Sequence, residues 1–465
     1  MSDAFLLAML ALFVGAMFLV GAVQLGVLNF EVCWAVTAGH LDQSSLVSCT
    51  TPGALTKQVG FGAALNWSIG LILLFPMFVY CVRETAVQSR VAIEEFVRRK
   101  MIVDKNWKPA SKVAVMKLLN RRRIVLIVAS MLVAVISTSI IPFDYRNVVG
   151  NFYEPGEKVD DFPLTDPELE ADWSIAAPIC RALDHADPRC ERPQQYYLLN
   201  AVFAAGAYGY LAYFGSILAI TFAFALGLFS TFFVSRDFTR AGYRLLPDLA
   251  STDPRKGFEV LEGFFLHAVA GCFVLFVMGY LVVLQNVYLR TSYSNVAELV
   301  VPFLAPVKAD DLAGGLFSAV QRAVTEQLGV LNLNSVAVTG AAFLIVFVIV
   351  ISAWFALRTT ARGGAQVVAA GLENPAGIHP QLALHLGALS PKQARADLQQ
   401  MQYWPLEWPT LNTLICWLAL AILSLFFVTV GFFVMAAGLG YVIQHALLRS
   451  GAAKASKGEE GEEGA

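Results

Sequence analysis

Residues 263–288 read GFFLHAVAGCFVLFVMGYLVVLQNVY and contain no Asp, Glu, Lys or Arg. About 20 consecutive apolar residues in a helix cross the hydrocarbon core of a bilayer, so this stretch predicts a membrane-spanning helix. The whole chain of 465 residues has the same character, because 57% of its residues are hydrophobic and only 15% are charged. Soluble proteins carry about 25% charged residues. The composition predicts a polytopic membrane protein, and the net charge of −2 argues against a nucleic-acid partner, which needs a basic surface.

Seven apolar stretches are long enough to span a membrane, and none of them contains an acidic or basic residue. They are residues 4–28, 58–82, 124–142, 199–234, 263–288, 336–357 and 410–446. The first lacks the basic region that precedes a cleavable signal, which predicts an uncleaved span. The last is long enough for two short crossings. We expect an all-α integral membrane protein, a polytopic helical bundle of about seven transmembrane helices, or eight if the last apolar segment is a hairpin.

The charges between these spans predict the orientation. Segment 83–123 has 12 basic and 4 acidic residues, whereas loop 143–198 has 5 basic and 12 acidic residues. Cytoplasmic loops carry the excess of Lys and Arg, so 83–123 is expected inside and 143–198 outside an inner or plasma membrane. The N-terminus is then cytoplasmic. With seven spans the C-terminus lies outside, and with eight it lies inside.

This orientation divides the chain into alternating units. They are a first transmembrane hairpin over 1–82, a basic cytoplasmic helical linker over 83–123, a second hairpin over 124–234 with the acidic extracytoplasmic loop 143–198, a cytoplasmic linker over 235–262, a third hairpin over 263–357 with an extracytoplasmic amphipathic helix over 312–331, a cytoplasmic helical linker over 358–409, a last transmembrane segment over 410–446 and a disordered acidic tail over 447–465.

The cysteines fit the same orientation. Cys33 and Cys49 share one loop assigned outside, and Cys180 and Cys190 share another. Cysteines in an oxidising compartment form disulfides, so a small disulfide-pinned extracytoplasmic region is predicted, with the pairing among the four left open. The three remaining cysteines fall within spans and are expected to be buried thiols. They are Cys81, Cys272 and Cys416.

Three local patterns predict structure in the cytoplasmic segments. Apolar residues at helical spacing after position 82 predict that the second span continues as a helix into 83–101. Asp253-Pro254 reads as an N-cap followed by proline at the first helical position. Ser390-Pro391-Lys392-Gln393 reads as a capping box that opens a helix through about Tyr403.

Candidate functional residues are few. His267 lies three to five residues into the fifth span, and a lone histidine near a helix end is more often packed than part of a relay. Polar residues within spans could line a path for ions, and these are Ser137, Thr138, Ser139, Gln285 and Asn286. Basic residues beside spans attract anionic headgroups, which predicts a surface for lipid or a partner at Arg98, Arg99, Lys100, Arg121, Arg122 and Arg123.

Motifs for catalysis are missing from the sequence. It contains no GxxxxGK[ST] or GxGxxG phosphate loop and no HExxH zinc motif, and we predict no catalytic, cofactor or metal site.

The first hypothesis is a non-catalytic sensor, scaffold or assembly subunit that works with a protein partner or as a homo-oligomer and contacts anionic lipid headgroups of the bilayer. The alternative is an ion channel or uniporter with a cation-attracting outer vestibule. A lipid-modifying enzyme, acting around His267, His40 or His445, ranks third.

Overall fold

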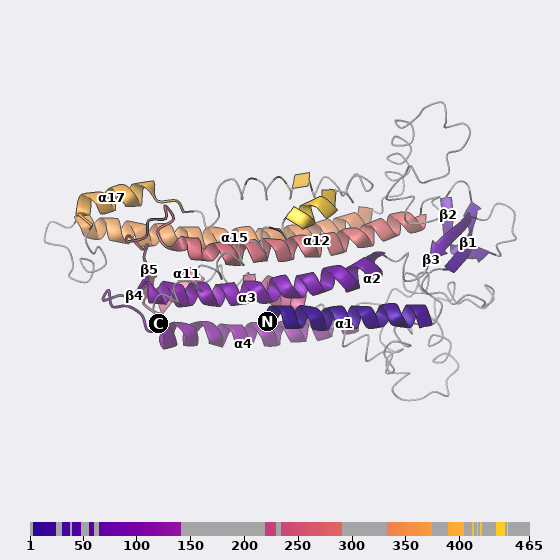
Figure 1. Ribbon diagram of the computed structural model, residues 1–465, viewed down its shortest axis with the longest axis horizontal. Helices are drawn as coiled ribbons and strands as arrows, with labels where there is room; N and C mark the ends of the chain where they lie inside the picture. The colour runs from indigo at the N-terminus through magenta and orange to yellow at the C-terminus, as the bar shows by residue number, and fades with distance from the viewer. Residues whose placement is uncertain are drawn as a thin grey trace, which may run out of the picture.

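A computed structural model gives the arrangement of the chain (Figure 1). It describes residues 3–24, 30–37, 40–47, 55–59, 65–140, 219–228, 234–290, 333–373 and 389–403, with shorter pieces at 412, 416, 419–420, 434–441 and 444. These residues are mostly helical, as the apolar periodicity predicts. The long helices run along the longest axis of the molecule, with one small sheet at one end (Figure 1).

Helices occupy the described parts of the predicted apolar stretches, except residues 58–59, which belong to a strand. Two helical stretches in the described residues, Gly70–Arg98 and Phe258–Leu281, are long and apolar enough to cross a membrane. The helices are α1 Asp3–Gln24, α2 Leu65–Ile69, the π-helical η1 Gly70–Leu74, α3 Phe75–Arg98, α4 Lys112–Ile140, α11 Val234–Arg240, the 3-10 turn η3 Phe258–Leu261, α12 Glu262–Arg290, α15 Leu333–Glu373 and α17 Pro391–Gln400. The continuation of the second span as a helix is confirmed by α3.

The segment between the first two helices is not the irregular loop that an all-α fold implies. It contains β1 Phe30–Thr37, β2 His40–Val47 and β3 Leu55–Val59, which form an antiparallel sheet in the order β2-β1-β3. Cys33 of β1 lies opposite Val47 of β2 and Thr56 of β3. The expectation of a purely α-helical chain is therefore wrong here. The β1 sequence FEVCWAVT is rich in β-branched and aromatic residues, which favour strands.

A second, two-stranded sheet joins two segments that the sequence analysis treated as separate linkers. β4 Ile102–Asp104 follows α3, and β5 Tyr243–Leu245 follows α11. The strands are antiparallel, with Ile102 opposite Leu245. The backbone N–H of Leu246 continues the pairing by donating to the Met101 carbonyl at 2.7 Å.

The core lies along α12, which packs against α3 on one side and α15 on the other. Gly271 permits a close approach there, because a Cβ at this position would lie 2.9 Å from a ring carbon of Phe224 and 3.5 Å from the Cβ of Cys81. Cys81 and Cys272 are buried free thiols, as predicted. Cys416 is exposed, so its predicted burial is wrong, because no described element covers it.

Two helices present apolar side chains to their surroundings. Apolar side chains of α1 and of the middle of α4 are exposed, including Leu10, Phe13, Ile124, Val125 and Leu132. Soluble monomers rarely leave apolar surface of this extent in water. This exposure is compatible with membrane association of the helices.

Several sequence predictions lie outside the described residues. These are Cys49, Cys180, Cys190, the loop 143–198, the amphipathic helix 312–331 and the tail 447–465. Cys33 is described through its backbone on β1. Within the described part of the chain there is no disulfide.

Candidate functional site

The charged end of the molecule is organised by the way α3 stops. Lys100 has a φ of 57°, and its N–H donates to the Val97 carbonyl while the Met101 N–H donates to the Phe96 carbonyl. These two bonds form a Schellman motif, in which the left-handed residue is usually glycine. The motif reverses the chain, buries Met101 completely and leads it into β4.

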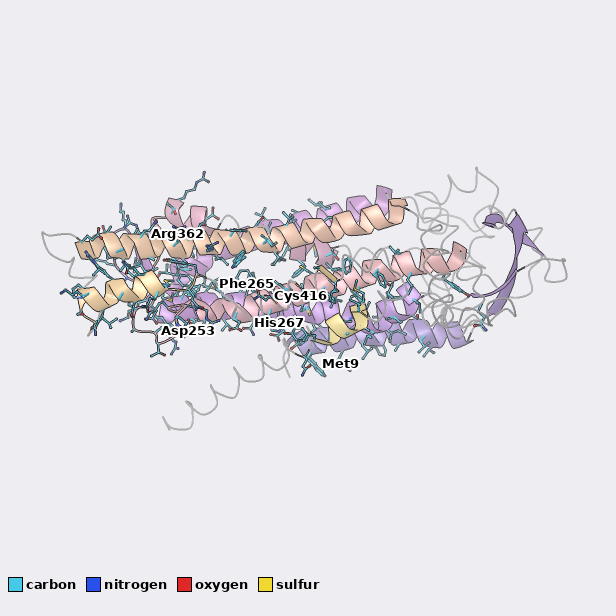
Figure 2. The ribbon with its side chains drawn as sticks, turned by 90° about the horizontal axis from the view of Figure 1, so that it is seen from above. Met9, Asp253, Phe265, His267, Arg362 and Cys416 are labelled. Atoms are coloured by element: carbon cyan, nitrogen blue, oxygen red, sulfur yellow. The ribbon has the colours of Figure 1, made fainter. Side chains whose placement is uncertain are left out.

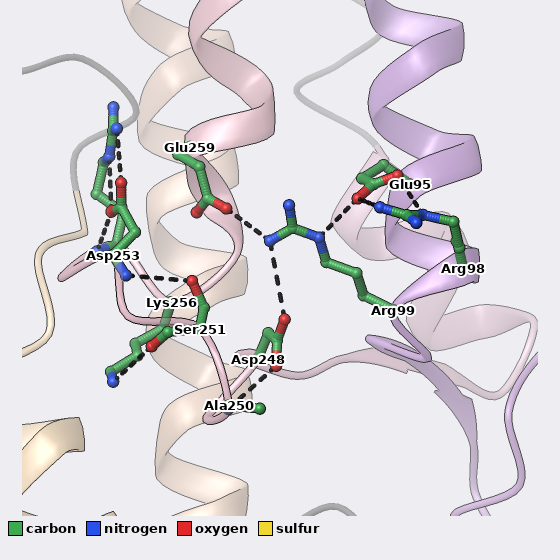
Figure 3. Close-up of polar contacts among 10 residues, drawn as sticks. Glu95, Arg98, Arg99, Asp248, Ala250, Ser251, Asp253, Lys256 and Glu259 are labelled. Carbon is green, nitrogen blue, oxygen red and sulfur yellow. Dashed lines mark hydrogen bonds and ion pairs between the residues drawn. The ribbon is translucent and has the colours of Figure 1, made fainter. Parts of the chain in front are cut away.

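Arg99, at the C-terminal end of α3, connects three segments through its guanidinium (Figure 3). Its Nε donates to Glu95 Oε1 at 2.7 Å, and its Nη1 donates to Glu259 Oε1 of η3 at 2.6 Å. The same Nη1 lies 3.8 Å from Asp248 Oδ2, in the segment after β5. The Arg99 side chain is only 26% exposed, so these contacts are shielded from water more than ordinary surface ion pairs.

A second set of ion pairs lies in the turn before α12. Arg255 donates through Nη2 to Asp253 Oδ2 at 2.8 Å and through Nη1 to Glu262 Oε2 at 2.9 Å. The hydrogen bonds from Arg255 lower the pKa of Asp253 below its ordinary value of 3.8, against the effect of burial. Lys256 Nζ donates to the Ser251 carbonyl at 3.0 Å and to Asp397 Oδ2 of α17 at 2.8 Å. We call the residues 95, 99, 248, 253, 255, 256, 259, 262 and 397 the charged cluster.

This arrangement corrects one prediction and confirms another. Asp253 does not cap α12: its Oδ1 accepts from the Arg255 N–H at 2.7 Å within a turn, and left-handed Lys256 and Gly257 separate that turn from the helix. The capping box at Ser390 is present, since the Ser390 side chain accepts from the Gln393 N–H and the Gln393 side chain accepts from the Ser390 N–H. The helix it opens ends at Gln400 rather than near Tyr403.

The predicted basic surface is divided by the structure. The Arg98 side chain is 72% exposed and pairs with Glu95 at 2.6 Å, whereas Arg99 is engaged in the charged cluster. Lys100 is exposed at the left-handed end of α3. Arg121, Arg122 and Arg123 lie on α4, and their side chains are outside the described part of the chain.

The predicted polar path is placed through its helices only. Ser137, Thr138 and Ser139 belong to α4, and Gln285 and Asn286 belong to α12. α3 lies between these two helices in the view of Figure 1. The side chains of all five residues lie outside the described set, so the path stays a prediction.

The opposite end of α12 is attached to the small sheet. Tyr288, which is completely buried, donates its hydroxyl to the backbone carbonyl of Gln58 on β3 at 2.6 Å. α12 therefore contacts the sheet at one end and the charged cluster at the other. Nothing in the apolar pattern of 263–288 distinguishes Tyr288 as an anchor.

The sequence analysis also missed most of the charged cluster. The sequence feature that could have indicated the charged cluster is the even balance of 5 basic and 5 acidic residues in 235–262, which differs from the basic excess of the preceding linker.

Among the described residues, no group of three or more His, Cys, Asp or Glu side chains is arranged to hold a metal ion. Comparison with protein-family models, curated proteins and solved structures finds no match to this chain.

Proposed function

We propose that this chain is a non-catalytic membrane sensor or scaffold of about seven spans, in which the α3–α12 pair couples an outer sheet to a cytoplasmic charged cluster. The observation that carries the proposal is the attachment of this pair at both of its ends. Tyr288 binds the carbonyl of Gln58 at the sheet, and Arg99 binds Glu259 at the cluster. A helix of 29 residues extends about 44 Å, which is long enough to put the two attachments on opposite sides of a bilayer core of about 30 Å.

The orientation follows from the distribution of basic residues. The cluster end adjoins the basic segment 83–123, which is expected in the cytoplasm. The sheet end is then extracytoplasmic, where Cys33 would form a disulfide with one of the other outer cysteines. In this arrangement the sheet and the loop 143–198 receive a signal or a partner outside, and the cluster transmits it inside.

The rigidity of the connection supports transmission over this distance. α12 has a nearly continuous row of buried side chains, including Phe273, Phe276, Tyr280 and Leu284. Close-packed interiors deform little and transmit displacement. A change at the sheet would therefore reach the cluster as a movement of the whole helix. The exposed Arg98 and Lys100 beside the cluster would face anionic headgroups or a cytoplasmic partner.

The test is hydrogen exchange measured by mass spectrometry on the full chain in lipid nanodiscs. Tyr288→Phe removes the hydroxyl that binds Gln58. We expect faster exchange in β3 and also in residues 245–257 at the far end. Tyr243→Phe is the matched control, because this tyrosine hydroxyl makes no hydrogen bond recorded in the described residues, and we expect no change in β3.

Two results would contradict the proposal. One is faster exchange in β3 with residues 245–257 unchanged, which would show that the two ends are not coupled. The other is saturable cation current through proteoliposomes containing the purified protein, which would favour the channel hypothesis.

A further inference from the structure

The α3–α12 interface contains two buried ionisable side chains at the same level. Glu84 of α3 is 3% exposed, and His267 of α12 is 2% exposed. A Cβ on Gly263 would lie 2.9 Å from Gln88 Oε1, and a Cβ on Gly271 would lie 3.5 Å from the Cβ of Cys81. The residue numbers of the two helices therefore run in opposite directions along the interface. Position 267 is midway between 263 and 271, which places it level with position 84.

The hydrogen bond of His267 determines its tautomer. Its Nδ1 lies 2.7 Å from the Gly263 carbonyl oxygen, and a carbonyl can only accept. Nδ1 therefore carries the hydrogen, and in the neutral ring Nε2 is an acceptor. Nε2 is buried and has no hydrogen-bond partner among the described residues. The ring of Tyr80 contacts the imidazole at a centroid distance of 6.4 Å.

Glu84 is the buried carboxyl at the level of His267 on the facing helix. In the described part of the chain its carboxylate makes no recorded hydrogen bond or ion pair. The hydroxyl of Thr85, the neighbouring donor, is already bound to the Cys81 carbonyl at 2.7 Å. A buried carboxylate without a partner is unfavourable. Other charged or titratable residues on the elements packed here include Tyr80, Cys81 and Arg83 on α3, Glu262 and Cys272 on α12, Glu259 on η3, and Arg358 and Arg362 on α15.

We propose that Glu84 and His267 form a binding site for one proton between α3 and α12. Without the proton, the carboxylate oxygens and Nε2 are all acceptors, so no hydrogen bond can join them. One proton taken from water creates an O–H···N or O⁻···H–N bond between the two side chains and raises the charge of the protein by one. Proton uptake then draws the two helices together at this level, and release lets them separate. Figure 2 shows His267 on α12 within the helix bundle.

The site does not depend on the sensor proposal, although it would supply that proposal with a stimulus. The sequence analysis treated His267 as a lone histidine because the charge-free span was taken to end at residue 82. The structure continues the helix through Glu84 and buries this residue against α12. The missing second group was therefore two residues beyond the predicted boundary.

The experiment is nitrogen NMR on the full chain in lipid nanodiscs with labelled histidine, compared between high and low pH. His267→Gln identifies the His267 signals. At high pH we expect hydrogen on Nδ1 and an unprotonated Nε2. On acidification we expect the Nε2 signal to move as it acquires the shared proton. The opposite tautomer at high pH would overturn the proposal.

Glu84→Gln provides the decisive comparison. A glutamine amide can donate to Nε2 but cannot take up a proton, so Nε2 should stay an acceptor and the His267 signals should lose their pH dependence. Glu94→Gln is the matched control on the same helix, because Glu94 pairs with Arg90 and Lys112. It should leave the His267 titration unchanged. A His267 titration that is identical with and without Glu84 would overturn the proposal.

A second readout follows the carboxyl group itself. Infrared difference spectra between high and low pH should show a buried carboxyl whose hydrogen bonding changes. This signal should be absent from Glu84→Gln and present in Glu94→Gln. Its persistence in Glu84→Gln would assign the titrating carboxyl elsewhere and refute the site.

Discussion

Two consecutive glycines on α15 give a sharp test of how this helix packs on the second sheet. A Cβ on Gly364 would overlap the backbone carbonyl oxygen of Leu245 and lie 3.1 Å from its carbonyl carbon. A Cβ on Gly363 would meet nothing within 4 Å. Gly364→Ala and Gly363→Ala therefore add the same methyl group to the same turn, and only the first one meets β5.

The expected magnitudes follow from two opposing effects. Alanine is favoured over glycine in a helix interior by about 0.5–1 kcal/mol, and both variants gain this. A methyl group forced against backbone cannot be relieved by a rotamer change, and overpacking of this kind costs about 1–3 kcal/mol. Gly363→Ala should be stabilised by the first amount. Gly364→Ala should be less stable than Gly363→Ala by about 1–3 kcal/mol.

The assay is equilibrium unfolding in mixed detergent micelles, followed by tryptophan fluorescence, with Trp354 on the same helix as a reporter. Hydrogen exchange of residues 243–246 should rise in Gly364→Ala and stay unchanged in Gly363→Ala. Equal stabilities of the two variants, with equal protection of β5, would refute the contact between α15 and the sheet.

Three further predictions concern the charged end. Arg99→Gln should destabilise the protein by about 1–3 kcal/mol, because it leaves the carboxylates of two segments without their donor. The control is Arg98→Gln, at an exposed position, which should change stability by less than about 0.5 kcal/mol. A similar loss of stability in both variants would contradict the assigned role of Arg99. Because Arg255 lowers the pKa of Asp253 in the folded state, the stability that Asp253 contributes is present above its ordinary pKa of 3.8 and is lost as the pH falls below it. The difference in melting temperature between the unmodified chain and Asp253→Asn should therefore shrink on acidification, and a difference that grows would reverse this sign. Lys100→Gly should stabilise the protein by about 1 kcal/mol by relieving the left-handed backbone, and Lys100→Ala, which keeps the strain, serves as the control for the lost charge in the same unfolding assay.

The apolar runs predicted helices well because a membrane span imposes a simple rule on sequence. Residues 263–288 were predicted as a span, and α12 covers Glu262–Arg290. The helical continuation after residue 82 and the capping box at Ser390 were also predictable, since both depend on residues close together in the chain.

The features that were missed depend on residues far apart in the sequence. β4 and β5 are three residues long, too short for an alternating pattern to be recognised, and their pairing depends on how α3 and α11 are placed. Arg99 was predicted to face lipid or a partner because its triplet is basic. Its carboxylate partners Asp248 and Glu259 come from another linker, so no local pattern could reveal the contact. Glu84 was missed because the span boundary was drawn by composition.

The pairing of β4 with β5 also constrains how the protein is made. β4 leaves the ribosome with the first linker, but its partner strand is synthesised only after α4 and all residues up to α11. During that interval Met101 and Val103, which the finished fold buries completely, have no β5 to cover them. The sheet can therefore close only after the chain has been synthesised through β5. A quality-control protease that recognises exposed apolar residues next to α3 would find them in incomplete chains and not in finished ones.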